Sequence, residues 1–277
     1  MTTTTFIGGG NMGCALVGGL LAHGRRPDEI RVVEPSAPQR EKLAARFPGV
    51  RVHAQADAAA LAGAGLVVFA VKPQQMREAA GAVAPHLGRA PETVVLSIAA
   101  GIRVADLARW LGGHRRIVRA MPNTPALIGK GISGIWAAPE VDAAGRARCA
   151  AVLDAGGEVV WVAAETMLDA VTGVSGSGPA YVFYFLEALE QAARDLGFPA
   201  ADARRLAYAT FDGAIALAKA SADEPAMLRA QVTSKGGTTA AALASMDADR
   251  VKDAIVAAVK AAAERARSLG DEFGGDA

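Results

Sequence analysis

The sequence contains little cysteine, few aromatic residues and no long apolar run. Its two cysteines, Cys14 and Cys149, lack a CxxC spacing and a neighbouring histidine cluster, which argues against a disulfide framework and a zinc site. No stretch of about 18 consecutive apolar residues is present, and no basic segment precedes an apolar run at the N-terminus. We therefore expect no metal site, no membrane span and no signal peptide, and a cytoplasmic location.

A strong charge of either sign is also missing. The 29 basic side chains nearly balance the 28 acidic ones, and no block of Lys and Arg stands out, so nucleic acid is not an expected partner. The sequence is instead rich in apolar residues, which make up 52% of its 277 residues. That length and composition can bury a sizeable core, and we expect two moderate domains rather than one large one.

The first part of the chain alternates short β-rich runs with alanine- and leucine-rich helical stretches. The runs cover residues 4–7, 30–34, 66–71, 93–98 and 117–120, and two more, 132–137 and 158–162, extend the series. This rhythm is typical of a parallel sheet built from βαβ units. It predicts an α/β domain over residues 1–162.

The second part reads as helix throughout. Helix-forming composition covers residues 179–196, 200–220, 226–231, 239–245 and 250–269, which predicts an all-α domain over residues 163–277. The first of these helices is apolar around most of its circumference, so it should be buried on more than one side. We expect burial in a subunit interface; core packing within one chain is the alternative.

A glycine-rich loop follows the first predicted strand. Ile7, Gly8, Gly9, Gly10, Asn11, Met12 and Gly13 fit the G-x-G-x-x-G pattern between a strand and a helix. In that pattern Gly8 makes the tight turn, Gly10 lets the backbone approach a pyrophosphate, and Gly13 lets the helix pack on the strand. The helix start then offers N–H groups to the phosphates, so we expect a dinucleotide here.

Glu34 ends the second predicted strand, where an acidic residue commonly binds the adenine ribose hydroxyls. Its charge would repel a 2′-phosphate, with only Arg40 and the neutral donor Ser36 nearby to compensate. The expectation is therefore NADH or NADPH, with NADH slightly favoured. A solvated strand end is the alternative interpretation of Glu34.

The later strands end in loops suited to the rest of a dinucleotide, because ligands bind at the carboxyl edge of such sheets. Small side chains after the fourth run leave room for nicotinamide, and Asn123 offers a donor and an acceptor to its carboxamide, although a structural turn remains the alternative. The candidate residues are Ala70, Val71, Lys72, Pro73, Ile98, Ala99, Ala100 and Asn123.

Two motifs lie beyond the sheet. Residues 170–181 combine glycines, hydroxyls and a proline ahead of a helix, either because something approaches closely or because the connection into a buried helix is elaborate. Residues 231–239 lead into another helix, whose backbone N–H groups could bind a carboxylate. Lys235 in this motif could form a Schiff base or act as an acid, but an exposed ammonium is the expected state.

Together, residues 8–13, 70–73, 121–125, 169–181 and 232–239 resemble pyrroline-5-carboxylate reductase over nearly the whole chain. The resemblance implies a Rossmann domain, a helical dimerisation domain, and reduction of Δ1-pyrroline-5-carboxylate to L-proline by NAD(P)H as the last step of proline biosynthesis. It also implies a homodimer or a decamer built from dimers.

The resemblance assigns roles to individual residues. Ser234, Gly237, Thr238 and Thr239 should bind the substrate carboxylate, with the Thr239 hydroxyl near the ring nitrogen as the catalytic group. Glu165 falls at a substrate position, and Gln231 is expected to contact the cofactor. Asp57 stands where relatives often carry Asn near the adenine ribose, which weakens the case for NADPH.

Two rival functions remain. A reductase for another small imine or keto acid would need a catalytic lysine, for which Lys235 is the candidate. A dinucleotide-binding protein without turnover would keep residues 8–13 but would not need residues 234–239, so the intact second motif argues against it.

Overall fold

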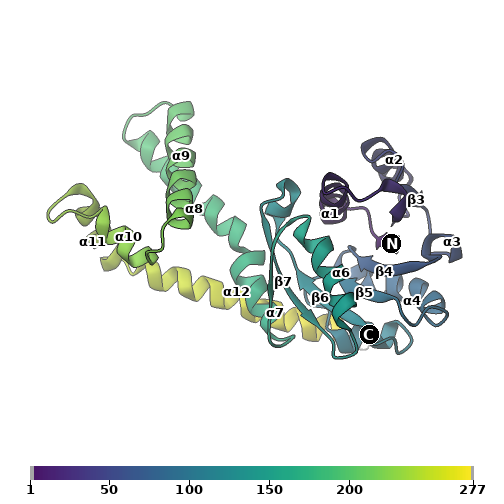
Figure 1. Cartoon of the computed structure of the whole chain (residues 1–277). Coiled ribbons are helices and arrows are strands. Elements are labelled where there is room, and N and C mark those ends of the chain that lie inside the picture. The colour runs from purple at the N-terminus through teal and green to yellow at the C-terminus, as the bar shows by residue number, and fades with distance from the viewer. Residues whose placement is uncertain (1–2, 276–277) are drawn as a thin grey trace. The chain divides into compact units, whose positions relative to one another are not determined.

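The computed structural model describes residues 3–275 and divides the chain into two compact units. One unit comprises the residues up to Ser177 together with those from Ala261 onward, and the other spans Gly178–Lys260. Figure 1 labels helices and strands of both units. The expected domain boundary after Val162 differs from this division. Leu168 is only 1% exposed, and Val171 packs against Gly134 in a strand of the sheet, so residues 163–177 stay with the sheet.

In the part of the chain described, the first unit is built on one eight-stranded sheet in the order β3-β2-β1-β4-β5-β6-β7-β8. The strands are β1 (Thr3–Ile7), β2 (Ile30–Val33), β3 (Arg51–His53), β4 (Ala64–Phe69), β5 (Val94–Ser97), β6 (Ile117–Met121), β7 (Gly131–Ala137) and β8 (Gly157–Trp161). All neighbours pair in parallel except β6 and β7. The expected α/β class is confirmed, as are the seven expected strands.

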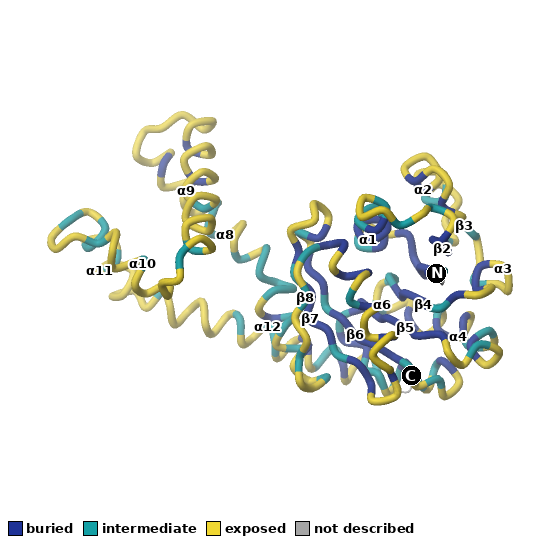
Figure 2. Tube along the Cα trace, in the orientation of Figure 1, coloured by how far each residue is buried: buried dark blue, intermediate teal, exposed yellow. Residues whose placement is uncertain are grey.

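Helices cover both faces of this sheet, which is why its strands are apolar on both sides. The helices are α1 (Asn11–Ala22), α2 (Ala37–Arg46), α3 (Ala58–Leu61), α4 (Met76–Leu87), α5 (Val104–Trp110), α6 (Ala143–Asp154) and α7 (Met167–Val171). Alternate residues of β1 enter different cores: Phe6 packs with the α1, α2 and α6 side, Ile7 with the α3, α4 and α5 side. Figure 2 shows the sheet buried along most of its length.

Local polar contacts explain where some helices begin. Asp142 precedes α6, and its Oδ1 accepts the Gly145 N–H at 2.7 Å, while Arg116 lies 2.9 Å from Oδ2. The Arg116 hydrogen bond and then the Gly145 N–H hold the pKa of this carboxyl below its usual value. Asp142 therefore acts as an ionised N-cap that also ties α6 to the segment before β6.

The second unit is helical, as expected. It contains α8 (Gly178–Asp195), α9 (Ala200–Ala220), α10 (Pro225–Gln231), α11 (Thr238–Ala248) and the first part of α12 (Val251–Gly274). Large apolar side chains remain exposed here, with Phe183 57%, Tyr184 72% and Ile215 58% accessible. Packing within one chain therefore does not bury these side chains, which favours the expected subunit interface over core packing within one chain. Within residues 3–275, no helix has the length and apolar composition needed to cross a bilayer.

Candidate active site

The glycine loop joins β1 to α1 and has the backbone geometry that its sequence predicts. Gly8 adopts a φ of +104°, and a Cβ placed on it would lie 2.8 Å from the Ala70 carbonyl oxygen. At Gly13 a Cβ would lie 2.6 Å from the Gly8 oxygen, so only glycine lets α1 start this close to the strand.

Gly10 differs, because a Cβ there would meet nothing within 4 Å. Gly10 is the N-cap residue of α1, and the first N–H groups of a helix have no partner inside it. The open space at Gly10 and these N–H groups form a cradle of the kind that accepts a pyrophosphate. A dinucleotide therefore fits this loop.

Hydrogen bonds with three side chains fix the backbone of Gly9. Its N–H donates to Glu34 Oε2 at 3.0 Å, and its carbonyl oxygen accepts Gln39 Nε2 at 2.6 Å and the Cys14 thiol at 3.3 Å. Glu34 Oε1 accepts the Ser36 N–H at 2.9 Å. Glu34 is thus a half-buried carboxylate that fixes both the glycine loop and the start of α2, rather than a solvated strand end.

A cavity of about 670 Å³ extends from the glycine loop along the carboxyl edge of β1, β2 and β4. Eight of the expected cofactor residues line it: Ile7, Gly8, Gly10, Glu34, Asp57, Ala70, Val71 and Lys72. Asp57 is also the N-cap of α3, where its Oδ1 accepts the Ala60 N–H at 2.8 Å. That hydrogen bond holds the pKa of the exposed Asp57 carboxyl below its usual value, so the carboxylate stays charged.

A second cavity of about 250 Å³ shares the wall formed by Ala70 and Val71. It extends to the ends of β5 and β6, and Met12, Ile98, Ala100 and Asn123 also line it, as expected for the nicotinamide end of a dinucleotide. The remaining expected residues, Gly9, Asn11, Gly13, Ser36, Pro73 and Ala99, lie in the same loops next to those that line the cavities.

Asn123 is buried, and its amide is engaged by the backbone. Its Oδ1 accepts the Ile132 N–H at 2.9 Å, and its Nδ2 donates to the Ser175 oxygen at 3.1 Å. The amide therefore joins the loop after β6 to β7 and to the segment that follows α7. These contacts favour the structural interpretation of Asn123, although the residue also lines the smaller cavity.

The glycine- and serine-rich segment after α7 forms a π-helical turn at Thr172–Gly176. Gly176 lines the smaller cavity, and a Cβ on it would lie 2.7 Å from Met121 Cε. The chain therefore approaches the cavity closely here and then enters α8. A π-helical turn is rare and often marks a functional site, so a functional role of this motif stays a prediction beside its structural role as the connection into α8.

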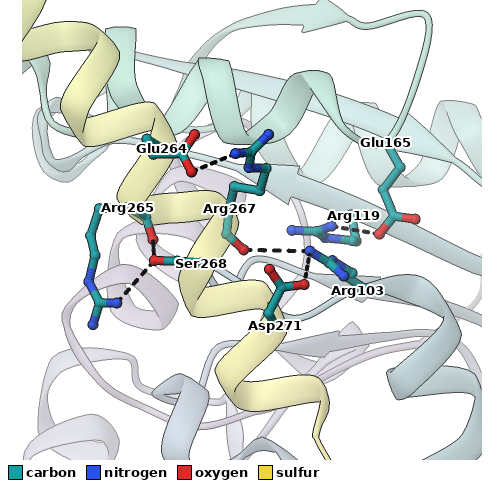
Figure 3. Close-up of polar contacts among 8 residues, drawn as sticks. All are labelled: Arg103, Arg119, Glu165, Glu264, Arg265, Arg267, Ser268 and Asp271. Atoms are coloured by element: carbon teal, nitrogen blue, oxygen red, sulfur yellow. Dashed lines mark hydrogen bonds and ion pairs between the residues drawn. The ribbon is translucent and has the colours of Figure 1, made fainter.

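Glu165 belongs to a charged cluster on the first unit (Figure 3). Its Oε1 accepts the buried Arg119 guanidinium at 2.6 Å and the Val104 N–H at 2.8 Å, which caps α5. Asp169 is half-buried nearby; burial raises the pKa of its carboxyl, while Arg119 and Arg103 oppose that rise. Glu165 therefore links β6 and α5.

The second expected motif lies in the helical unit. Gly236 has a φ of +72°, Gly237 is the N-cap of α11, and the Gly237 N–H donates to the Ser234 oxygen at 3.0 Å. Ser234, Gly237, Thr238 and Thr239 thus surround a helix N-terminus, whereas Gln231 bonds to Asp223 at 2.8 Å. Lys235 is exposed, as expected for an ordinary ammonium.

In the comparison with known proteins, two family models match separate parts of the chain. A family model described as pyrroline-5-carboxylate reductase dimerisation matches residues 165–269, and one described as NADP oxidoreductase, coenzyme F420-dependent, matches residues 3–101. The pyrroline-5-carboxylate reductase of Pseudomonas aeruginosa is 44% identical over 269 residues, which are 97% of each chain. The chain belongs to the pyrroline-5-carboxylate reductase family. Members of this family are NAD(P)H-dependent oxidoreductases.

Two solved pyrroline-5-carboxylate reductases resemble the whole chain. The Coxiella burnetii structure superposes with a TM-score of 0.90 at 35% identity, covering 97% of this chain and 98% of that one. The Plasmodium falciparum structure, which was solved with NADP bound, gives 0.85 at 26% identity with the same coverage. The NADP oxidoreductase model covers the residues of the two cavities up to Gly101, and the dimerisation model covers Glu165 and residues 234–239.

Sequence reasoning missed two groups of cavity residues. The short strand β3 was not expected, so Ala54, Gln55 and Ala56 after it were missed. On and just before α4, the residues missed were Gln75, its N-cap, and Glu78, Ala79, Ala82 and His86. The α4 set has spacings of three and four residues, which place these side chains on one helix face. That periodicity was a usable signal, whereas three residues were too few to indicate β3.

Proposed function

We propose that this chain reduces Δ1-pyrroline-5-carboxylate to L-proline, the last step of proline biosynthesis, with NADH or NADPH. The observation that carries the proposal is the pair of cavities that share Ala70 and Val71, one beside the Gly10 cradle and one lined by small and apolar side chains. Such a pair suits a dinucleotide whose nicotinamide lies beyond its pyrophosphate. When bound, the cofactor supplies the hydride that reduces the imine carbon.

The residues of the glycine loop bind and orient the cofactor in this proposal. The α1 N-terminus at Gly10 faces the pyrophosphate, and Glu34 and Asp57 face the adenine ribose from two sides of the larger cavity. Both carboxylates disfavour a 2′-phosphate, which supports a slight preference for NADH. Pro122 and Gly176 restrict the space at the nicotinamide end.

The substrate carboxylate binds at the start of α11 in this proposal. The support is the left-handed Gly236, the N-cap at Gly237 and the absence of a side-chain cap on α11 within the described residues, which leave backbone N–H groups for an anion. Ser234 and Thr238 add hydroxyl donors. Thr239 lies next to the ring nitrogen and relays its proton, because the protonated imine is the better electrophile.

Glu165 takes part through its second oxygen. Arg119 and Val104 both donate to Oε1, and we assign Oε2 to the substrate side. The exposed position of Lys235 argues against the rival reductase, which needs a lysine as its acid. Lysines that act as acids or bases near neutral pH generally owe their lowered pKa to burial.

The oligomer belongs to the same proposal. The chain carries the family's dimerisation domain, and Phe183, Tyr184 and Ile215 are exposed on it, which supports a homodimer or a decamer built from dimers. We place the enzyme in the cytoplasm, where the unpaired Cys14 and Cys149 would stay reduced.

The direct test is turnover. NADH and NADPH oxidation is followed with pyrroline-5-carboxylate, and proline is identified as the product by mass spectrometry. Oxidation that requires this imine supports the proposal. Equal or faster oxidation with an open-chain keto acid plus ammonia, or with a six-membered imine, would favour the rival reductase, and dinucleotide binding without any turnover would favour the binding protein.

A further inference from the structure

The loop after β5 carries two side chains of the smaller cavity. Ile98 and Ala100 line that cavity, and the chain then turns at Gly101, whose φ is +73°, before α5 starts at Val104. Ile98, Ala99 and Ile102 are buried in the core clusters, whereas Ala100 is only half-buried and Gly101 has no side chain that could hold the turn between them. The conformation of the turn at Ala100 and Gly101 therefore depends on the segment that contacts it.

The last turns of α12 make those contacts. Arg103 Nη2 lies 2.8 Å from Asp271 Oδ1 and 3.5 Å from the Arg267 carbonyl oxygen, as Figure 3 shows. A Cβ on Gly101 would lie 3.2 Å from Phe273 Cδ2 and 3.3 Å from Leu269 Cβ. The side of α12 that bears these residues thus rests directly on the turn at Gly101.

A second contact holds α5, which the same loop enters. Arg109 Nη2 donates to the Gly274 carbonyl oxygen at 2.9 Å, and Phe273 packs against the core cluster that includes Ile102 and Leu107. These contacts all join residues 98–109 to residues 267–274, two segments of the same compact unit. One end of the chain therefore covers the loop that shapes the smaller cavity.

The exposure of the ion pair bears on its role. Arg103 is 41% and Asp271 66% exposed, and ion pairs this accessible contribute little to global stability. Two such groups can still select one loop conformation, because a loop opens locally at a lower free energy than the whole unit unfolds.

We propose that Arg103 and Asp271 are positioning residues, through which the end of α12 holds the loop of Ile98 and Ala100 in the conformation that accepts the nicotinamide end of the cofactor. This inference rests on the proposed function for the identity of the ligand. The loop and its contacts do not depend on the substrate, so the positioning role of Arg103 and Asp271 and the proposed reaction can be tested separately.

The experiment compares Arg103→Ala and Asp271→Asn with the matched control Glu272→Gln. Glu272 pairs with Arg265 on α12 itself, is about as exposed as Asp271, and within the described residues forms its ion pair with Arg265 rather than with the loop. Three properties are measured in the full chain: amide hydrogen exchange of residues 98–104 without ligand, the Kd for NADPH by fluorescence, and the melting temperature. The charge exchange Arg103→Asp with Asp271→Arg is the fourth variant.

We expect faster exchange at residues 98–104 and a Kd for NADPH raised roughly threefold to tenfold in both single variants, with little change in melting temperature. The charge exchange should recover at least part of the loss, and Glu272→Gln should resemble the wild type. Unchanged exchange and Kd in both single variants, or equal changes in Glu272→Gln, would overturn the inference. If the wild-type protein did not reduce pyrroline-5-carboxylate, the hydrogen exchange and the Kd for NADPH would still test the role of the two residues.

Discussion

Asn123 Oδ1 accepts the Ile132 N–H at 2.9 Å, which joins the end of β6 to the reversed strand β7 beside the smaller cavity. The same amide donates to the Ser175 oxygen in the π-helical turn. One buried side chain therefore joins β7 and the π-helical turn to the loop after β6, which lines the cavity.

Asn123→Ala should lower both stability and cofactor binding. The substitution leaves the Ile132 N–H and the Ser175 oxygen without their partner, at a cost of about 1–3 kcal/mol for a buried group. Denaturant unfolding measures the loss of stability, and a raised KM for NADPH would show the weaker binding of the cofactor in the cavity. Thr124→Ala is the control for stability, because Thr124 lines the same cavity but is exposed. Equal stability of the two variants would contradict the role of Asn123.

Thr239→Ala should reduce kcat/KM for pyrroline-5-carboxylate by roughly tenfold to a hundredfold, since a hydrogen bond to a charged group contributes about 1.5–3 kcal/mol. The Kd for the dinucleotide should stay unchanged. Thr239→Ser keeps the hydroxyl and should recover most of the activity. If a correctly folded Thr239→Ala variant keeps wild-type kinetics, the assigned role is wrong.

Glu34→Gln should shift cofactor preference toward NADPH. Removing one negative charge near the 2′-phosphate should change the ratio of kcat/KM for NADPH and NADH by about tenfold, on the scale of charge pairs near a protein surface. The control Glu41→Gln removes an exposed charge on α2 outside the two cavities. An unchanged ratio in Glu34→Gln would exclude Glu34 from cofactor choice.

Asp142 gives a pH-dependent stability. Its folded pKa lies below the unfolded value of about 3.9, so its contribution is present above that value and is lost as pH falls through the folded pKa. Asp142→Asn keeps an N-cap acceptor but loses the charge, so its melting temperature should be lower than that of the wild type at pH 7. The difference should shrink below about pH 4; a constant difference down to pH 3 would refute this account.

Local signals predicted the sheet and the glycine loop. Both the strand pattern and the glycine pattern of Gly8, Gly10 and Gly13 can be recognised within a few neighbouring residues. The contacts of Glu34 with Gly9 and of Asn123 with Ser175 were not predictable, because they join segments 25 and 52 positions apart. Ser234–Thr239 was found from its resemblance and its N-cap pattern. The roles carried over to Glu165 and Thr239 remain predictions.

The division of the chain into units determines when the sheet unit can complete its fold during synthesis. Residues 178–260 form one unit between two segments of the other, and Phe273, almost at the C-terminus, packs on a core that contains Ile7 from the first strand. During synthesis, that face of the core of the sheet unit therefore stays incomplete until Phe273 has been made, after the whole of residues 178–260.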